Sequence, residues 1–276
     1  MKRCAFLLAA VFFLSGFATI ERLFAPDAQP WERWKQHNPT STAHVDHAPW
    51  QAFLDRYLEV LDGDANRVRY GEVTGEDRST LDRYIETLTK LPIGAFARNE
   101  QLAYWINLYN ALTVQVVLNR YPVKTILDVD IAAGLFSNGP WDAKLIVIEG
   151  EGVSLNDIEH RILRPLWRDP RIHYVLNCAS IGCPDLRPRT LSPNSMDSVL
   201  TRAAQEFVNS SRGVSIEDNI VTVSRIYDWF HEDFGSSDRD VLGHIAGFAE
   251  PELRTRLEAI GEIHRVAYDW RLNDAP

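Results

Sequence analysis

The sequence has no glycine-rich phosphate loop, no dinucleotide-binding fingerprint and no Gly-x-Ser-x-Gly nucleophile elbow. Many nucleotide-binding enzymes and α/β-hydrolases carry one of these elements, because each places main-chain N–H groups or a serine where the reaction needs them. Their absence argues against a nucleotide-dependent enzyme. The chain also contains no internal repeat and no low-complexity segment, and nothing in it is typical of a disordered or fibrous protein.

Positive charge is scarce, with 29 Lys and Arg residues against 38 Asp and Glu residues. Binding to a nucleic-acid backbone depends on clustered Lys and Arg, so we expect no nucleic-acid partner. In contrast, 45% of the 276 residues are hydrophobic and 11% are aromatic. This composition is sufficient for one principal globular domain with a large core.

The N-terminus has a basic start followed by an uncharged run from Cys4 to Ile20. This pattern is typical of an export signal, and Gly16-Phe17-Ala18 has small residues at the right offsets for cleavage. We therefore predict a signal peptide over residues 1–18 and an exported protein of the periplasm or cell envelope. The alternative is an inner-membrane anchor formed by residues 4–20, which would make the membrane a partner, although this length is at the lower limit for a spanning helix.

Prolines and short polar residues without a sustained period predict a linker or loosely packed lead-in over residues 19–46. A single domain is expected over residues 47–276. Apolar residues at intervals of three and four predict its helices, whereas alternation and β-branched runs predict its strands. The expected helices cover 50–61, 81–91, 99–121, 155–166, 196–208, 226–234, 241–248 and 251–260, and the expected strands cover 67–73, 144–149, 171–176, 213–216, 220–223 and 263–270.

The segment 99–121 differs from the other helical segments because apolar residues occupy most of its circumference. Such a helix is central, and we predict an α+β domain with this buried helix packed on a small, mostly antiparallel sheet and surrounded by other helices. Glu100, Asn107 and Asn110 share one stripe of it. Buried polar groups need partners, so the two amides either hold a neighbouring loop by its main chain or support a reactive group in a cleft.

A second group of polar residues lies on the predicted helix 155–166, for which Ser154 is the expected N-cap. Glu159 falls on the apolar stripe of this helix, and His160 lies at the edge of that stripe. Glu159 is either a structural partner of Arg187 or Arg189, or a catalytic carboxylate. His160 is either a hydrogen-bonded structural residue or a base.

The segment from Arg171 to Arg187 contains an apolar run and then a small polar loop with Cys178 and Cys183. Cys178 is a candidate nucleophile, with His160 or His173 as base and Glu159 or Glu100 orienting the imidazole. His160 is preferred, because residues 173 and 178 point to opposite faces of a regular strand.

Two other chemistries are open for the same loop. The first is a disulfide between Cys178 and Cys183, which export favours. The second is a metal site that includes His173, but its His-x4-Cys-x4-Cys spacing matches no usual zinc arrangement. We therefore expect no metal and no cofactor.

Four motifs in order resemble the family known as domain of unknown function 547, or DUF547. The resemblance runs from about residue 47 to the end and implies an exported bacterial protein, without assigning an activity. The four motifs are Asn99-Glu100-Gln101-Leu102-Ala103-Tyr104-Trp105-Ile106-Asn107-Leu108-Tyr109-Asn110-Ala111-Leu112, Leu155-Asn156-Asp157-Ile158-Glu159-His160-Arg161-Ile162-Leu163-Arg164, the stretch from Asp169 to Pro184, and Tyr227-Asp228-Trp229-Phe230.

The first motif also faintly resembles the active-site helix of transglutaminase-like and papain-like thiol enzymes, with Trp105 and Asn107 as a Trp-x-Asn element. Leu102 stands where that helix carries its nucleophilic cysteine. This resemblance therefore implies that any thiol chemistry comes from Cys178 or Cys183.

The sequence thus leads to two main functional hypotheses. The first is a thiol-dependent hydrolase or acyl transferase acting on an amide or ester. The second is a non-catalytic envelope domain that binds a small molecule, peptide or glycan with its cysteines tied together, and a related version docks a protein partner on an aromatic surface. The expected catalytic residues are Cys178, His160, Glu159, Glu100 and Asn107, and the expected ligand-binding residues are Asn110, Asn177, Ser180, Cys183 and Arg187.

Overall fold

The computed structural model describes residues 28–129, 131 and 139–275. The predicted signal peptide or membrane anchor lies outside these residues. Among the helices that are described, none has the length and apolar character needed to cross a membrane.

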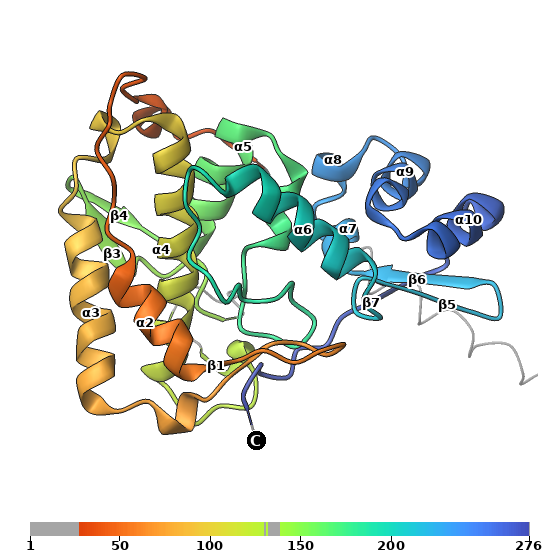
Figure 1. Cartoon of the computed structure of the whole chain (residues 1–276), viewed down its shortest axis with the longest axis horizontal. Coiled ribbons are helices and arrows are strands. Elements are labelled where there is room, and N and C mark those ends of the chain that lie inside the picture. The colour runs from red at the N-terminus through yellow and green to blue at the C-terminus, as the bar shows by residue number, and fades with distance from the viewer. Residues whose placement is uncertain (1–27, 130, 132–138, 276) are drawn as a thin grey trace, which may run out of the picture.

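Short helices and a few long ones make up most of the domain (Figure 1). The α-helices are α2 Ala48–Tyr57, α3 Gly75–Thr89, α4 Arg98–Leu118, α5 Arg164–Trp167, α6 Met196–Val208, α7 Ile226–Trp229, α8 His231–Phe234, α9 Asp238–Phe248 and α10 Pro251–Ile260. Single 3-10 turns are η1 Glu32–Lys35, η2 Tyr70–Glu72, η3 Ile93–Ala95, η4 Ile126–Asp128 and η6 Pro170–Tyr174, and η5 Asp157–Leu163 is a π-helix.

Helix α4 is the centre of the domain, as the sequence predicted. Apolar side chains surround it on all sides, and Tyr104, Ile106 and Leu108 are fully buried. Figure 1 shows α3 beside α4 at one end of the molecule, while α8, α9 and α10 form the other end. A helix that is apolar around its whole circumference gains most when other elements cover every face, which explains its position.

Within the described residues the strands form three separate small sheets, so the predicted α+β class is confirmed, whereas the predicted single sheet is wrong. Strands β1 (Leu58–Glu59) and β2 (Arg67–Val68) are antiparallel, as are β3 (Ile146–Ile148) and β4 (Glu151–Val153). The third sheet has the order β5 (Val214–Glu217), β6 (Ile220–Ser224) and β7 (Arg265–Ala267), with β5 and β6 antiparallel and β7 parallel to β6.

The hairpin of β5 and β6 is the predicted one, with Glu217 opposite Ile220. Its two turn residues, Asp218 and Asn219, both have positive φ angles, at 48° and 63°. Two-residue hairpin loops favour this conformation because its twist matches the twist of the flanking strands.

Several predicted elements are wrong in type or extent, and the predicted strand 67–73 is a strand only at Arg67–Val68, before the turn η2. The run before Asn177 is not a strand but the 3-10 helix η6, because Pro170 fixes its own φ and the Asp169 side chain accepts a hydrogen bond from the Arg171 N–H at 2.9 Å. The predicted helix 50–61 ends at Tyr57, and the two residues after it pair as β1. The predicted helix 226–234 is divided into α7 and α8 at Phe230.

The part of the predicted lead-in that is described packs on the domain. The Trp31 N–H donates to the Arg161 carbonyl at 2.9 Å. Trp34 is 4% exposed, and its ring meets that of Trp105 edge to face with centroids 5.3 Å apart. Two buried indole rings contribute to the core in proportion to the large apolar area they remove from water.

Candidate functional site

The two cysteines of the loop after η6 form a disulfide, with their Cα atoms 6.1 Å apart. Cys183 is buried, at 4% exposure, whereas Cys178 is partly exposed. Neither sulfur is therefore a thiol in this state, and a nucleophilic role for Cys178 requires reduction of the disulfide first. The same bond removes the sulfurs as ligands for the metal site that the sequence left open.

The phenol of Tyr268 contacts both sulfurs of the disulfide. Its hydroxyl lies 2.9 Å from Cys178 Sγ and 3.3 Å from Cys183 Sγ. Burial raises the pKa of Tyr268 above that of a free tyrosine, so the group stays a protonated donor. The Cys178 N–H donates to Cys183 Sγ at 2.9 Å. The disulfide thus receives hydrogen bonds from a side chain and from the main chain.

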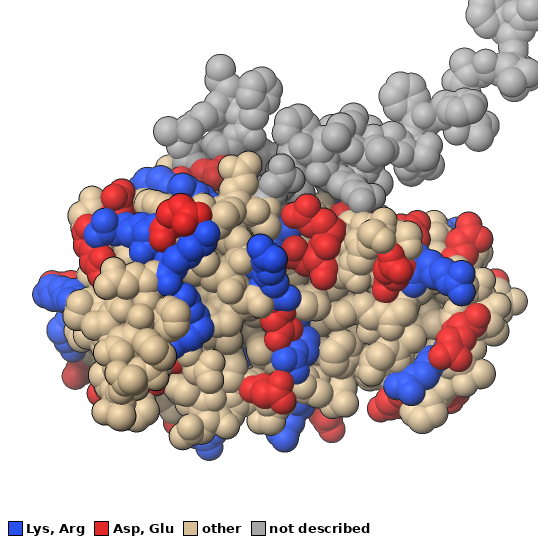
Figure 2. Space-filling model, turned by 90° about the horizontal axis from the view of Figure 1, so that it is seen from above, with Lys and Arg blue, Asp and Glu red and all other residues tan. Residues whose placement is uncertain are grey.

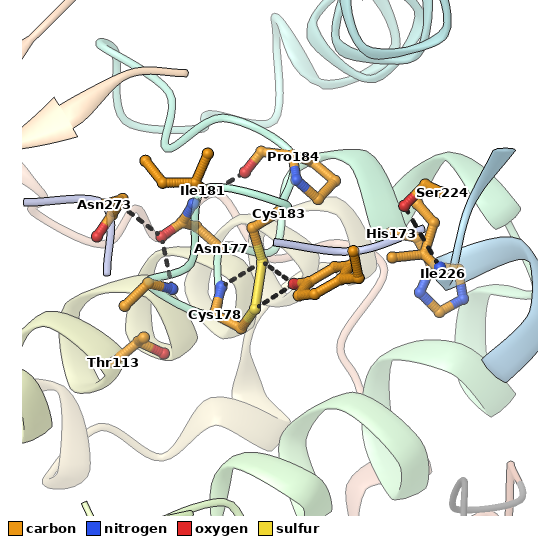
Figure 3. The surroundings of a disulfide bond; sticks show 12 residues. Thr113, His173, Asn177, Cys178, Ile181, Cys183, Pro184, Ser224, Ile226 and Asn273 are labelled. Atoms are coloured by element: carbon orange, nitrogen blue, oxygen red, sulfur yellow. Dashed lines mark hydrogen bonds between the residues drawn. A yellow bond between two sulfur atoms is a disulfide. The ribbon is translucent and has the colours of Figure 1, made fainter. Parts of the chain in front are cut away.

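Asn177 and its partners hold the loop by its main chain. In Figure 3, Asn177, Pro184 and Asn273 lie around the disulfide. The Asn177 side-chain amide donates to the Pro184 carbonyl at 2.8 Å, and the Asn177 main-chain N–H donates to Asn110 Oδ1 at 2.9 Å. Asn110 also donates to the Val175 carbonyl at 2.9 Å. This contact agrees with the first hypothesis for the amides of α4, in which they hold a neighbouring loop by its main chain.

Asn107 makes a similar contact with another segment. Its amide donates to the Leu191 carbonyl at 2.9 Å and accepts from the Leu191 N–H at 3.1 Å. Asn107 is 1% exposed, so its amide, and not water, is the hydrogen-bond partner of the Leu191 carbonyl and N–H. Asn107 thus ties the loop after the cysteines to α4 and does not contact the disulfide.

Glu100 lies at the N-terminal end of α4 and contacts the lead-in instead of the cysteine loop. Its carboxylate accepts from the Val45 N–H at 2.8 Å and lies 3.1 Å from His44 Nδ1. Arg187 is also directed elsewhere, since it pairs with Glu206 of α6. Ser180 is 1% exposed, and its main chain bridges to Leu272. The Glu100 contacts thus hold the lead-in to α4, whereas those of Arg187 and Ser180 hold the cysteine segment to α6 and to the C-terminal segment.

A charged cluster, defined here as Glu159, His160, Arg164, His173 and Asp233, lies next to this region, and all of its members except the partly exposed Asp233 are buried. His173 stands between two carboxylates, with Nδ1 3.5 Å from Glu159 Oε1 and Nε2 2.7 Å from Asp233 Oδ2. Arg164 reaches Asp233 Oδ2 at 2.5 Å and His160 Nδ1 at 3.0 Å. The Tyr109 hydroxyl donates to Glu159 at 3.0 Å.

These contacts assign charges to the members of the cluster. Burial alone would raise the pKa of Glu159, but His160, His173 and Arg164 outweigh burial and hold its pKa at about 2. Burial likewise opposes the charge of His173, but its bonds to Asp233 and Glu159 raise its pKa. Burial lowers the pKa of His160 to about 4, so this imidazole is neutral at pH 7.

The predicted triad of Cys178, His160 and Glu159 is not assembled by hydrogen bonds in this state. Glu159 bonds to His173, not to His160, and the Nδ1 atom of His160 is occupied by Arg164. Within the described residues, no hydrogen bond or ion pair joins Cys178 to a histidine. The proposed pairing of Glu159 with Arg187 or Arg189 is wrong as well, because Arg187 pairs with Glu206 and Arg189 lies 3.7 Å from Asp55.

Burial and, to a lesser extent, the negative charge of Glu159 raise the pKa of Tyr268, so its phenol lies within electrostatic range of the charged cluster. Tyr268 is also part of an aromatic cluster, defined here as Trp141, Trp229, Phe230, Tyr268 and Trp270, whose members are all partly exposed. Ring centroids are 4.6 Å apart for Tyr268 and Trp270, 4.9 Å for Trp229 and Tyr268, and 6.1 Å for Trp141 and Trp270. Phe230 stacks on His173 at 4.5 Å.

Sequence reasoning missed three residues of this site. Tyr268 and Asp233 come from segments far from the cysteines in the sequence, whereas Arg164 lies at the end of the second motif but was given no role, and no spacing rule links the three to the loop. The aromatic pair in Tyr268-Asp269-Trp270 was the available signal, because a partly exposed strand end rich in Tyr and Trp is typical of a binding surface.

A separate pocket of about 250 Å³ lies at η1 and η3 and includes none of the predicted site residues. Arg33 at its edge pairs with Glu149 at 3.0 Å. Its lining residues are Arg33, Trp34, Gln36, Pro92, Ile93, Gly94, Ala95, Gln101, Trp105 and Glu149.

The fold and site together define an α+β domain with a disulfide-bonded loop beside the charged cluster. Residues 93–208 match the model of the family described as "Protein of unknown function, DUF547", which supports the resemblance to this family. The match covers α4, the charged helix η5, the cysteine loop and Trp141, and it leaves Tyr227 and the other four members of the aromatic cluster outside. No curated protein and no solved structure matches the chain, so the resemblance to transglutaminase-like and papain-like enzymes has no support.

Proposed function

We propose that the protein is an exported domain that binds a glycan on the aromatic cluster without catalysing a reaction of the glycan. The observation that carries this proposal is the gathering of five partly exposed aromatic side chains from three separate segments. Aromatic rings brought together from distant segments and left partly open to water are a recurrent feature of binding surfaces. Export rests on the charge pattern of the first twenty residues, and the disulfide is consistent with an oxidising compartment.

The chemistry of the cluster favours a glycan over the other ligands considered. Indole and phenol rings present flat apolar faces with polar edges, and a sugar ring offers the same combination of an apolar face and surrounding hydroxyls. Figure 2 shows acidic and basic side chains interspersed over one face of the molecule, without a large region of either sign. The net charge of −9 further disfavours a polyanionic ligand.

Two of the predicted ligand-binding residues, Asn110 and Asn177, support the aromatic cluster through the cysteine loop. Asn110 and Asn177 fix the main chain of the cysteine loop, and the disulfide lies against the Tyr268 hydroxyl. Tyr268 is in turn flanked by Trp229 and Trp270. A rigid support lowers the entropic cost of ordering the aromatic rings when a ligand binds.

Tryptophan fluorescence tests the proposal directly. The wild-type protein, Trp270→Ala and Trp31→Ala would each be titrated with short neutral and N-acetylated oligosaccharides. A parallel titration would use unfolded peptides. Trp31 is also partly exposed but packs on Arg161, away from the cluster. The proposal predicts saturable binding of an oligosaccharide that survives in Trp31→Ala and is lost in Trp270→Ala. Binding of peptides alone, or glycan binding that is unchanged in Trp270→Ala, would contradict it.

A thiol-dependent hydrolase or acyl transferase is the second candidate, supported by the 2.9 Å contact between Tyr268 and Cys178 Sγ. A hydroxyl donor stabilises a thiolate, so reduction of the disulfide would leave Cys178 with a bonded negative charge. Hydrolysis of activated esters by the reduced protein, absent from the oxidised protein and from Cys178→Ser, would support this candidate. Equal activity in Cys178→Ser would exclude Cys178 as the nucleophile.

A further inference from the structure

We propose that the Cys178–Cys183 disulfide is a thiol-exchange centre, in which the thiolate of a partner protein or peptide attacks Cys178 and Cys183 leaves. This activity goes beyond glycan binding and does not depend on it. It uses the disulfide itself as the oxidant, so the reaction needs no other redox group.

The two sulfurs differ in access to solvent. Cys178 is partly exposed, whereas Cys183 is 4% exposed. Exchange requires an incoming thiolate to approach one sulfur in line with the other, so attack on the accessible member of the pair is favoured. The greater exposure of residue Cys178 therefore favours its sulfur as the one that forms the mixed disulfide.

The buried sulfur has one main-chain donor and shares a second donor, the Tyr268 hydroxyl, with Cys178 Sγ, which lies 2.9 Å from that hydroxyl. The Cys178 N–H lies 2.9 Å from Cys183 Sγ, and the Tyr268 hydroxyl lies 3.3 Å from the same atom. When the bond breaks, Cys183 Sγ takes the electron pair and becomes a thiolate. Donors that bond to a thiolate lower its basicity and make it a better leaving group.

The reaction balances without further components. The partner thiolate forms a bond to Cys178 Sγ, the Cys178–Cys183 bond breaks, and its electron pair stays on Cys183 Sγ. A second thiolate of the partner then attacks the partner sulfur of the mixed disulfide, and the electron pair goes to Cys178. The partner dithiol loses two electrons and becomes a disulfide, while Cys178 and Cys183 are reduced and take up two protons in total.

The main chain around the cysteines is fixed independently of the disulfide. The Ile181 N–H donates to the Arg271 carbonyl and the Gly182 N–H donates to the Asp269 carbonyl, both at 2.8 Å. A Cβ at Gly182 would lie 2.7 Å from the Asp269 nitrogen, so the two segments approach each other closely. The cysteines therefore stay near each other after reduction, which makes closure of the disulfide an intramolecular step.

The test exposes the oxidised protein to reduced glutathione and, in parallel, to a reduced dithiol peptide, with acid quenching and peptide mapping. Glutathione should be found on Cys178 and not on Cys183, and the dithiol peptide should reduce the protein fully while the protein stays folded. Glutathione on Cys183, or a disulfide that is reduced only in denaturant, would overturn the proposal. Full reduction by glutathione but not by the peptide would show a small thiol, and not a protein or peptide thiol, as the partner.

Tyr268→Phe provides a second test that keeps the ring and removes the donor. Exchange should slow by at least about threefold, because the leaving thiolate loses one hydrogen bond. Tyr57→Phe is the matched control, since the Tyr57 hydroxyl bonds to Asp77 on α3 and not to the disulfide. Equal exchange rates in Tyr268→Phe and the wild-type protein would show that the hydroxyl does not assist the leaving sulfur.

Discussion

His173 Nε2 lies 2.7 Å from Asp233 Oδ2, a contact that joins the turn before the cysteine loop to α8. The same imidazole contacts the buried carboxylate of Glu159 through its other nitrogen. A histidine between two carboxylates thus links the family-matched part of the chain to the C-terminal helices. This arrangement leads to the first prediction.

Replacing His173 with Gln should lower the free energy of unfolding by about 3 kcal/mol or more. Removal of one partner leaves Glu159 as a buried charge with reduced compensation, and broken buried pairs typically cost 3–5 kcal/mol. Urea denaturation at pH 7 measures the change. His37→Gln is the control because His37 is exposed, and an equal midpoint for the two variants would show that the cluster contributes little.

The protein should lose stability as the pH falls from about 6.5 toward 4. Burial lowers the pKa of His47 to about 4, and that of His244 to about 4, from an ordinary value of 6.5. In this window the unfolded chain binds protons that the folded chain does not, so protonation favours unfolding. His47→Gln should flatten the curve of unfolding free energy against pH. An unchanged slope in this variant would show that His47 titrates normally in the folded protein.

His173 contributes with the opposite sign. Its bonds to Asp233 and Glu159 raise its pKa above 6.5, so its stabilising effect is complete at pH values below 6.5. The effect is lost as the pH rises through the raised value, because the folded state then gives up the proton that holds the two carboxylates. The difference in stability between wild type and His173→Gln should therefore shrink at alkaline pH. A difference that grows with pH would contradict the assigned charge.

Asn107→Leu should destabilise the protein by about 1–3 kcal/mol for each of the two Leu191 main-chain groups that lose their partner. A leucine of similar size fills the space but neither donates nor accepts. Thermal denaturation compares this variant with Asn119→Leu, since Asn119 is exposed at the end of α4. Similar melting temperatures would mean that the loop at Leu191 has other support.

Reduction of the disulfide should lower the unfolding free energy by roughly 2 kcal/mol, the value for closing a loop of this length. The change is modest because the loop keeps its bonds to Asn110 and to the C-terminal segment. Denaturant curves of the oxidised protein and of a Cys178→Ser, Cys183→Ser double variant measure it. Failure of the double variant to fold would show that the disulfide is needed for the loop to form.

The sequence predicted elements whose own residues determine them. Helix α4 has apolar residues around its whole circumference, and the β5–β6 hairpin has an Asp-Asn turn that favours positive φ. The turn η6 was predicted as a strand because its apolar run fits both a buried strand and a buried helical turn, and Pro170 decides between them.

The candidate site was less accessible to sequence reasoning. Cys178, Glu159 and Asn110 were found because a thiol, a carboxylate and an amide at buried positions need an explanation. Their partners could not be predicted, since Tyr268 and Asp233 approach them only through the tertiary fold. The same residue types are compatible with a triad or with a structural network, and only distances distinguish the two.

The most direct measurement of the central claim follows the indole N–H signals of the eight tryptophans by nuclear magnetic resonance during an oligosaccharide titration. Glycan binding on the aromatic cluster predicts shifts for Trp141, Trp229 and Trp270. The signals of the buried residues Trp34, Trp50 and Trp105 should remain unchanged. No shift with any oligosaccharide, or shifts confined to Trp34 and Trp105, would contradict the account.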